Sequence, residues 1–157
     1  MELVRHDIAV GNILYGHAQF ITLRLTDQWD IAPGVGRPEV DATHDRCNRK
    51  WIATGKAWYV LFHRELGWAM ELMLESRVQG KLNPTDDTEQ ITVNGHPALV
   101  RRRQRKRGVL RRKIITCIEV IFNCEVSDRQ LRIELSGRCP PEGFQQVMET
   151  IPKWWCH

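Results

Sequence analysis

Apolar and polar residues alternate along several short stretches of the chain, a period typical of half-buried β-strands. The alternation is clearest in residues 18–25, where Ile21, Leu23 and Leu25 share one face. Other stretches with strand character span residues 3–10, 50–63 and 89–93. The chain therefore begins with strands rather than helices.

Turn signals divide these stretches. Thr54-Gly55 predicts a turn that makes residues 50–63 a hairpin. Asn94-Gly95 is a strong tight-turn signal, and the next strand is expected to begin near Pro97, which cannot donate to a ladder. Residues 31–48 are rich in glycine, proline and polar side chains and predict a loop.

Residues 114–136 predict a second hairpin. Val120 and Phe122 lie on one face of its first strand, and Ile133 and Leu135 on one face of its second. These faces coincide only if paired residue numbers sum to an odd value. A turn at Ser127-Asp128 gives a sum of 255, with Phe122 opposite Ile133.

Two stretches follow helical spacing. Residues 65–79 place Leu66, Met70 and Met73 on one face, and residues 141–151 begin with Pro141 and carry an apolar stripe. Strands, a helix, an antiparallel meander and a final helix predict an α+β fold with two helices packed on an antiparallel sheet.

Length and composition place few limits on function. The 157 residues, 42% of them hydrophobic, predict one domain over residues 1–157. No apolar run reaches the length of a membrane span, and the first residues lack a secretory signal. We therefore expect a cytoplasmic protein with no membrane partner.

The basic charge is concentrated in one segment. Residues 101–113 hold nine Lys or Arg and no acid, whereas the rest of the chain holds 14 basic and 19 acidic residues, a balance of −5. A turn at Lys106-Arg107-Gly108 would fold the segment into a hairpin with Arg103 opposite Arg111. Like charges opposed across two strands repel, and a bound polyanion would relieve that repulsion. The candidate contacts are Arg101, Arg102, Arg103, Arg105, Lys106, Arg107, Arg111, Arg112 and Lys113.

Other interpretations of this hairpin stay open. It is equally a solvated ribbon, or one paired with the acidic residues Asp86, Asp87 and Glu89. Seven of its nine cations are arginine, which favours bidentate phosphate contacts. Because no aromatic residue lies within the segment, sequence-specific recognition through stacking has no support.

Cysteine and histidine offer weak metal candidates. The five cysteines are expected to be mostly reduced, and Cys117 and Cys139 fall on opposite faces of the hairpin, which argues against a disulfide between them. The pairs His44/Cys47 and Cys156/His157 together could supply four ligands. They lie about a hundred residues apart without finger-like spacing, so no metal and no cofactor is predicted. Structural roles are expected for His63 and His96.

No catalytic motif is recognisable. The chain has no Gly-x-Ser-x-Gly elbow, glycine-rich phosphate loop or His-Glu-x-x-His helix. Cys47, Cys117 or Cys139 would need a histidine to activate it. The sequence favours a non-enzymatic protein, with an enzyme whose active site has no motif as one alternative.

Three segments resemble the PsbP/Mog1-like α+β fold. Residues 18–29 look like that group's opening strand followed by a tryptophan, residues 91–98 are similar to its strand and turn before the meander, and residues 129–151 match its closing strand and helix. The resemblance implies a scaffold that binds a protein or small ligand.

The prediction is a binding protein whose basic hairpin contacts a polyanion, with nucleic-acid phosphate as the first candidate. The alternative is a PsbP/Mog1-like scaffold that uses a pocket or an aromatic surface. The six tryptophans are expected mainly to pack in or beside the core. Alternatively, they form a pocket or partner surface, and the pair Trp154-Trp155 would suit a homodimer.

Overall fold

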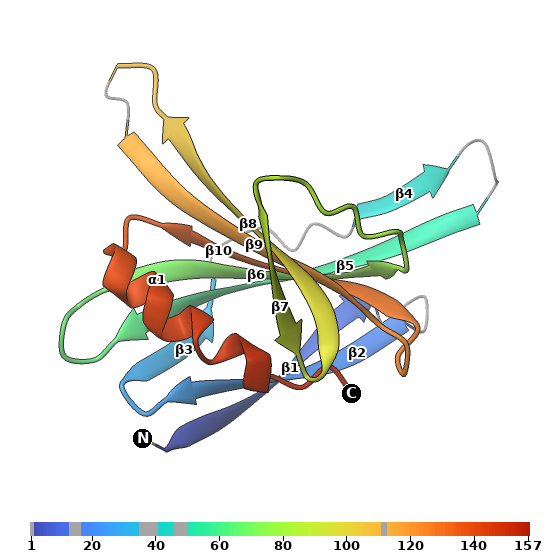
Figure 1. Cartoon of the computed structure of the whole chain (residues 1–157), viewed down its shortest axis with the longest axis horizontal. Coiled ribbons are helices and arrows are strands. Elements are labelled where there is room, and N and C mark those ends of the chain that lie inside the picture. The colour runs from blue at the N-terminus through green and yellow to red at the C-terminus, as the bar shows by residue number, and fades with distance from the viewer. Residues whose placement is uncertain (1, 13–16, 35–40, 46–49, 111–112) are drawn as a thin grey trace.

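The computed structural model describes residues 2–12, 17–34, 41–45, 50–110 and 113–157. Within them it is mostly antiparallel β-structure (Figure 1). Strands β3, β5, β6, β10, β9, β8 and β7 follow one another across the large sheet, and β4 pairs with β5. The strands are β1 (Leu3–Asn12), β2 (His17–Thr26), β3 (Trp29–Pro33), β4 (Asp41–Asp45), β5 (Lys50–His63), β6 (Ala69–Val78), β7 (Thr88–Val93), β8 (His96–Arg107), β9 (Lys113–Cys124) and β10 (Arg129–Gly137).

The predicted α+β class with two packed helices is therefore wrong. The described residues hold one α-helix, α1 (Pro141–Met148), followed by a short 3₁₀ turn, η2 (Ile151–Lys153). Residues 65–79 form no helix, because β6 occupies most of this segment between β5 and β10. A central strand is buried on both faces, so its apolar run also satisfies helical spacing.

Two further sequence predictions are wrong. No turn forms at Thr54-Gly55, because β5 runs through it and Gly55 pairs with Ser76 of β6. The predicted loop 31–48 contains β4 and most of β3. A long partner strand on one side outweighs the local turn preference of two residues.

The predicted hairpin of β9 and β10 has the correct faces and the wrong register. Phe122 lies opposite Leu131 and Val120 opposite Ile133, so paired numbers sum to 253 rather than 255. The odd sum preserves the apolar face, as the parity argument requires. Four residues connect the strands, and Asp128 adopts a positive φ of 55°.

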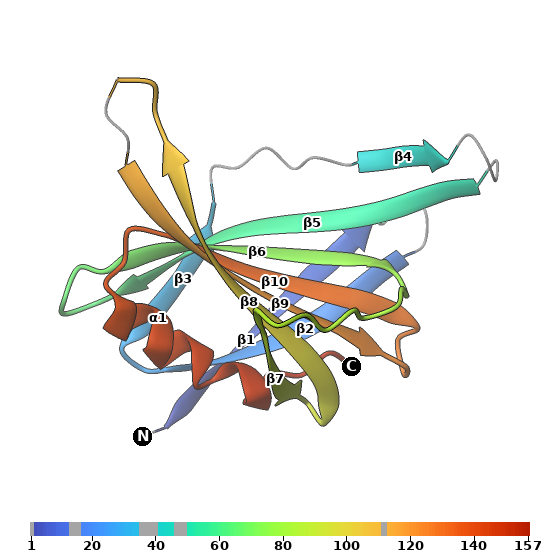
Figure 2. The ribbon, with the colours of Figure 1, turned by 45° about the horizontal axis from the view of Figure 1, so that its top comes forward.

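The core lies on one face of the large sheet. The β1–β2 hairpin, α1 and the C-terminal segment cover this face (Figure 2). Leu23, Leu72, Val120 and Leu135 are fully or almost fully buried there. Burial of the apolar side chains of this core is the main favourable contribution to folding. No helix in the described ranges is long and apolar enough to cross a membrane.

Candidate functional site

The basic segment, residues 101–113, contains the end of β8 and the first residue of β9, and is called the basic arm here. Its tip extends beyond the body of the sheet in both views of the ribbon (Figures 1 and 2). Gly108, which follows the last residue of β8, has a φ of 105° that suits glycine.

The register of the basic arm differs from the prediction. Paired numbers sum to 220, so Arg103 lies opposite Cys117 and Arg105 opposite Ile115. Arg107 and Lys113 are the one pair of cations that the described register places opposite each other. The predicted repulsion between arginines on opposite strands is therefore mostly absent, because the basic end of β8 pairs with a largely apolar part of β9. Arg111 and Arg112 lie outside the described residues.

Cations at the base of the arm have acidic partners. Arg101 Nε lies 3.7 Å from an Asp87 carboxylate oxygen, and Arg102 Nε lies 3.2 Å from Glu89. This pairing is the one that the alternative interpretation of the segment expected. Both carboxylates are largely exposed, so each ion pair is weak and open to competition.

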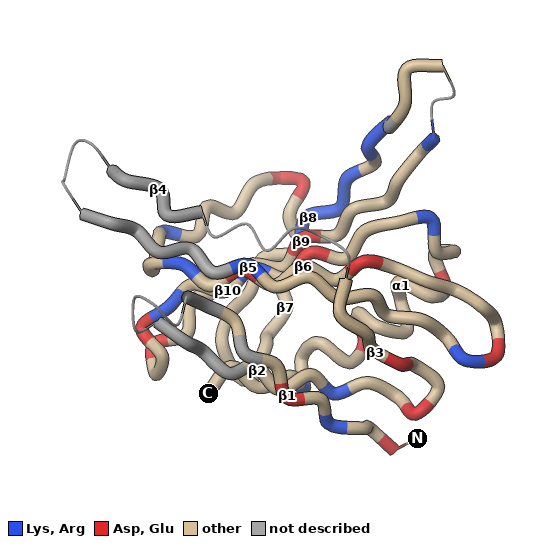
Figure 3. Tube along the Cα trace, turned by 180° about the vertical axis from the view of Figure 1, so that it is seen from behind, with Lys and Arg blue, Asp and Glu red and all other residues tan. Residues whose placement is uncertain are grey.

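Farther along the arm, the described side chains of Arg103, Arg105 and Lys106 are exposed. Arg103, Arg105 and Lys106 make no ion pair among the described residues, and no carboxylate lies along the projecting part of the arm (Figure 3). Arg103 and Arg105 share one face of the strand, whereas Lys106 lies on the other. Val109 and Leu110 at the tip are each 98% exposed. Both faces of the arm therefore present positive charge to solvent.

An open groove lies beside the arm, on the face of the sheet opposite the core. Its volume is about 350 Å³, and its lining includes Arg105, Cys117, Glu134 and Arg138. Burial, with a hydrogen bond to Glu134, raises the pKa of the Cys117 thiol to about 11. Burial likewise raises the pKa of Cys139 to about 11. The thiolate is the nucleophilic form of cysteine, so an activated cysteine has a lowered pKa. The pKa values of Cys117 and Cys139 are raised instead.

A second group of residues gathers at the opposite end of β8 and β9. His96 begins β8 directly after the Asn94-Gly95 turn, and Cys124 ends β9. The register that pairs Ala98 with Phe122, continued by two residues, brings His96 opposite Cys124 on the core face. These two residues are therefore positioned by the β8–β9 ladder.

The C-terminal segment carries two more residues to the same place. Trp155 pairs with Thr22 of β2 through two backbone hydrogen bonds of 2.9 Å. The buried indole of Trp154 donates to the carbonyl of Arg24 and to Thr150 Oγ1, each at 3.1 Å. Cys156 and His157 follow directly and reach Cys124 and His96. These four residues are called the Cys-His cluster below.

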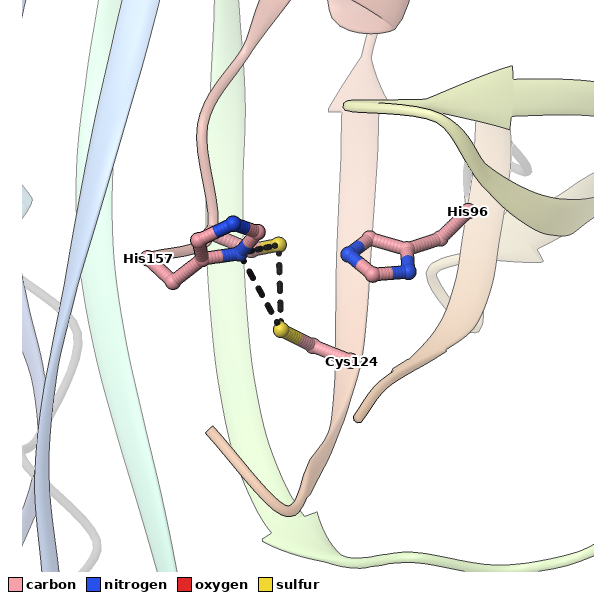
Figure 4. Close-up of side chains that lie close together, drawn as sticks. His96, Cys124 and His157 are labelled. Atoms are coloured by element: carbon pink, nitrogen blue, oxygen red, sulfur yellow. Dashed lines mark hydrogen bonds between the residues drawn. The ribbon is translucent and has the colours of Figure 1, made fainter. Parts of the chain in front are cut away.

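The four donor atoms of the Cys-His cluster all lie within 4.8 Å of one another (Figure 4). Sγ of Cys156 lies 3.2 Å from Sγ of Cys124 and 3.2 Å from Nδ1 of His157. Cys124 Sγ lies 3.5 Å from the same nitrogen. Tetrahedral zinc bonds of about 2.0–2.3 Å separate ligand atoms by roughly 3.3–3.8 Å. The separation of 3.5 Å falls within this range, and the two of 3.2 Å lie just below it.

His96 supplies the fourth donor. Its ring stacks on Phe122 with the planes 15° apart, and one ring nitrogen faces the two sulfur atoms in Figure 4. Its Nε2 is buried and has no hydrogen-bond partner within the described chain. The side-chain amide of Asn94 lies beside the cluster, with its Nδ2 3.5 Å from Cys156 Sγ. Burial and the neighbouring Cys124 raise the pKa of the Cys156 thiol to about 11.

Of the sequence-derived metal candidates, the structure brings Cys156 and His157 together, but with new partners. His44 pairs through its backbone with Trp51 in β4 and β5, and Cys47 lies outside the described residues. Sequence reasoning missed Cys124 and gave His96 only a structural role. The sequence gives little indication of this group, because its residues lie at the start of β8, at the end of β9 and in the C-terminal segment rather than in one short motif.

The remaining histidine and cysteine predictions agree with the geometry. His63 Nδ1 accepts backbone hydrogen bonds from Glu65 and Leu66, and its ring packs edge-on against Trp29. These contacts give His63 a structural role. Cys117 and Cys139 are both free thiols, so the argument against a disulfide between them is confirmed.

Comparison of the chain with family models, curated proteins and solved structures gives no match. The resemblance to the PsbP/Mog1-like group therefore stays a prediction.

Proposed function

We propose that this protein is a non-enzymatic binding protein whose basic arm contacts the phosphates of a nucleic acid. The observation that carries the proposal is the exposed, unpaired charge of Arg103, Arg105 and Lys106 on a ribbon that projects beyond the sheet. Attraction between such cations and phosphate does not depend on base sequence, because release of counterions drives it.

The form and charge of the arm support this ligand. A two-stranded β-ribbon fits the major groove of a duplex. Cations lie on both of its faces, with Arg103 and Arg105 on one and Lys106 on the other. Arginine predominates, and its planar guanidinium makes paired hydrogen bonds to phosphate oxygens. Outside residues 101–113 the chain has a balance of −5, which confines the attraction to the arm.

The test measures fluorescence anisotropy of labelled duplex DNA, single-stranded DNA and duplex RNA against increasing salt. The variant Arg105→Gln/Lys106→Gln removes two arm charges. Lys81→Gln/Lys153→Gln removes two exposed charges elsewhere and serves as the matched control. If each arm cation neutralises one phosphate of duplex DNA, the slope of log K against log salt falls by about 2. At about 0.1 M salt this corresponds to roughly 50-fold weaker binding.

Two results would overturn the proposal. One is the absence of binding at low salt, where electrostatic attraction is strongest. The other is equal weakening by the arm and control variants. Binding to vesicles of anionic phospholipid is measured separately, since the exposed Val109 and Leu110 would favour a lipid surface. Binding to these vesicles and to none of the nucleic acids would replace the proposed partner.

A further inference from the structure

We propose that His96, Cys124, Cys156 and His157 bind one Zn²⁺ ion in a closed, tetrahedral structural site. This inference goes beyond the proposed function, because the Cys-His cluster lies at the end of β8 and β9 remote from the basic arm. It rests on the convergence of four donor atoms from three separate parts of the chain.

The donor set suits zinc. Two thiolates and two imidazoles in a tetrahedral arrangement are typical of structural Zn²⁺ sites, whereas Mg²⁺ and Ca²⁺ require oxygen ligands. Cys124 and Cys156 are almost fully buried, at 0% and 1% exposure. The Cys156 thiol donates to Cys124 Sγ at 3.2 Å, and a cation bound by the two sulfur atoms would hold both as thiolates.

His96 supplies the independent sign of a missing ligand. A buried imidazole nitrogen without a hydrogen bond is costly, and the partner it lacks must lie on the side of the two sulfur atoms. An ion at the centre of the cluster would occupy that position. Asn94, 3.5 Å from Cys156, would then donate to a coordinated sulfur, the usual outer support of a metal ligand.

The site would fasten the end of the chain to the sheet. Cys156 and His157 belong to a segment that also pairs with β2 at Thr22 and closes one side of the core. A metal bond to His96 and Cys124 joins this segment to the β7–β8 turn and to the end of β9. We expect Zn²⁺ to raise the melting temperature and a strong chelator to lower it.

The test begins with untagged protein purified under reducing conditions and analysed for metal by mass spectrometry. A chelator then removes any bound metal, and Co²⁺ is added to the metal-free protein as a spectroscopic probe. One zinc per chain is expected, together with the visible absorption of tetrahedral Co²⁺ and a thiolate-to-cobalt charge-transfer band. In Cys156→Ser the charge-transfer band should lose about half its intensity. In Cys117→Ser, which changes a buried free thiol outside the cluster, the spectrum should be unchanged.

His157→Gln separates metal binding from folding, because the side chain is exposed at the chain end. It should fold like the wild type and bind Co²⁺ at least 10-fold more weakly. Three results would overturn the proposal. They are a reduced wild-type protein that binds neither metal, affinity that is unchanged in His157→Gln, and a site that Cys47→Ser abolishes but Cys124→Ala does not. A Cys124–Cys156 disulfide that persists in reductant, with no metal bound, would count against it equally.

Discussion

Arg132 lies among three glutamates on the face of the sheet opposite the core, and its replacement by leucine tests how that face is stabilised. Its guanidinium lies 2.6 Å from Glu134, 2.7 Å from Glu119 and 3.3 Å from Glu75. The register explains the grouping, because Glu119 lies directly opposite Glu134 and Arg132 directly opposite Glu75. Arg132→Leu would leave three carboxylates close together without a cation.

The expected loss follows from burial. The Arg132 side chain is 20% exposed and that of Glu75 only 8%. Removing one partner of a buried ion group costs about 3–5 kcal/mol, and the partial exposure here favours the lower value, about 3 kcal/mol. Arg64 is the matched control, since its ion pair with Asp30 is short but its side chain is 59% exposed. Arg64→Leu should cost less than about 1 kcal/mol.

Urea unfolding of both variants at pH 7 provides the measurement. In Arg132→Leu the three carboxylates would lie close together without a cation, which is the physical origin of the expected loss. Adding Glu134→Gln should recover about 1 kcal/mol, because it removes the repulsion with Glu119. A loss no larger than that of Arg64→Leu would refute this reasoning.

Two further predictions concern buried groups. The raised pKa of Cys117, about 11 against an ordinary 9.0, implies stability that is complete below pH 9 and lost as the pH rises toward 11. Thermal unfolding of Cys117→Ala should therefore show an alkaline decline smaller by up to about 2 kcal/mol, and parallel declines would contradict the prediction. Trp154→Phe removes the two indole hydrogen bonds that hold the C-terminal segment and should cost about 1–2 kcal/mol in denaturant unfolding. Trp155→Phe, which changes a half-exposed ring over Arg24, should cost less, and equal losses would count against the proposed anchoring.

Local chemistry allowed several elements to be predicted from the sequence. Strand β7 and the Asn94-Gly95 turn agree closely with their prediction, because both residues of that turn have the positive φ that asparagine and glycine tolerate. Pro141 begins α1 as expected. The apolar faces of β9 and β10 were identified by parity alone, since alternation decides the face whatever the exact pairing.

Tertiary structure decided the rest. β6 has the apolar spacing of a helix, and only its position between β5 and β10 makes it a strand. The register of the basic arm depends on the length of the turn at its tip, so parity could not show that Arg103 faces Cys117.

The Cys-His cluster shows the same limit most clearly. His96, Cys124 and Cys156 are separated by about thirty residues at each step, and no short spacing marks them as ligands. The β8–β9 ladder and the attachment of the C-terminal segment to β2 bring them together. Periodicity in the sequence determines which face of a strand is buried, whereas strand order and register determine which distant side chains meet.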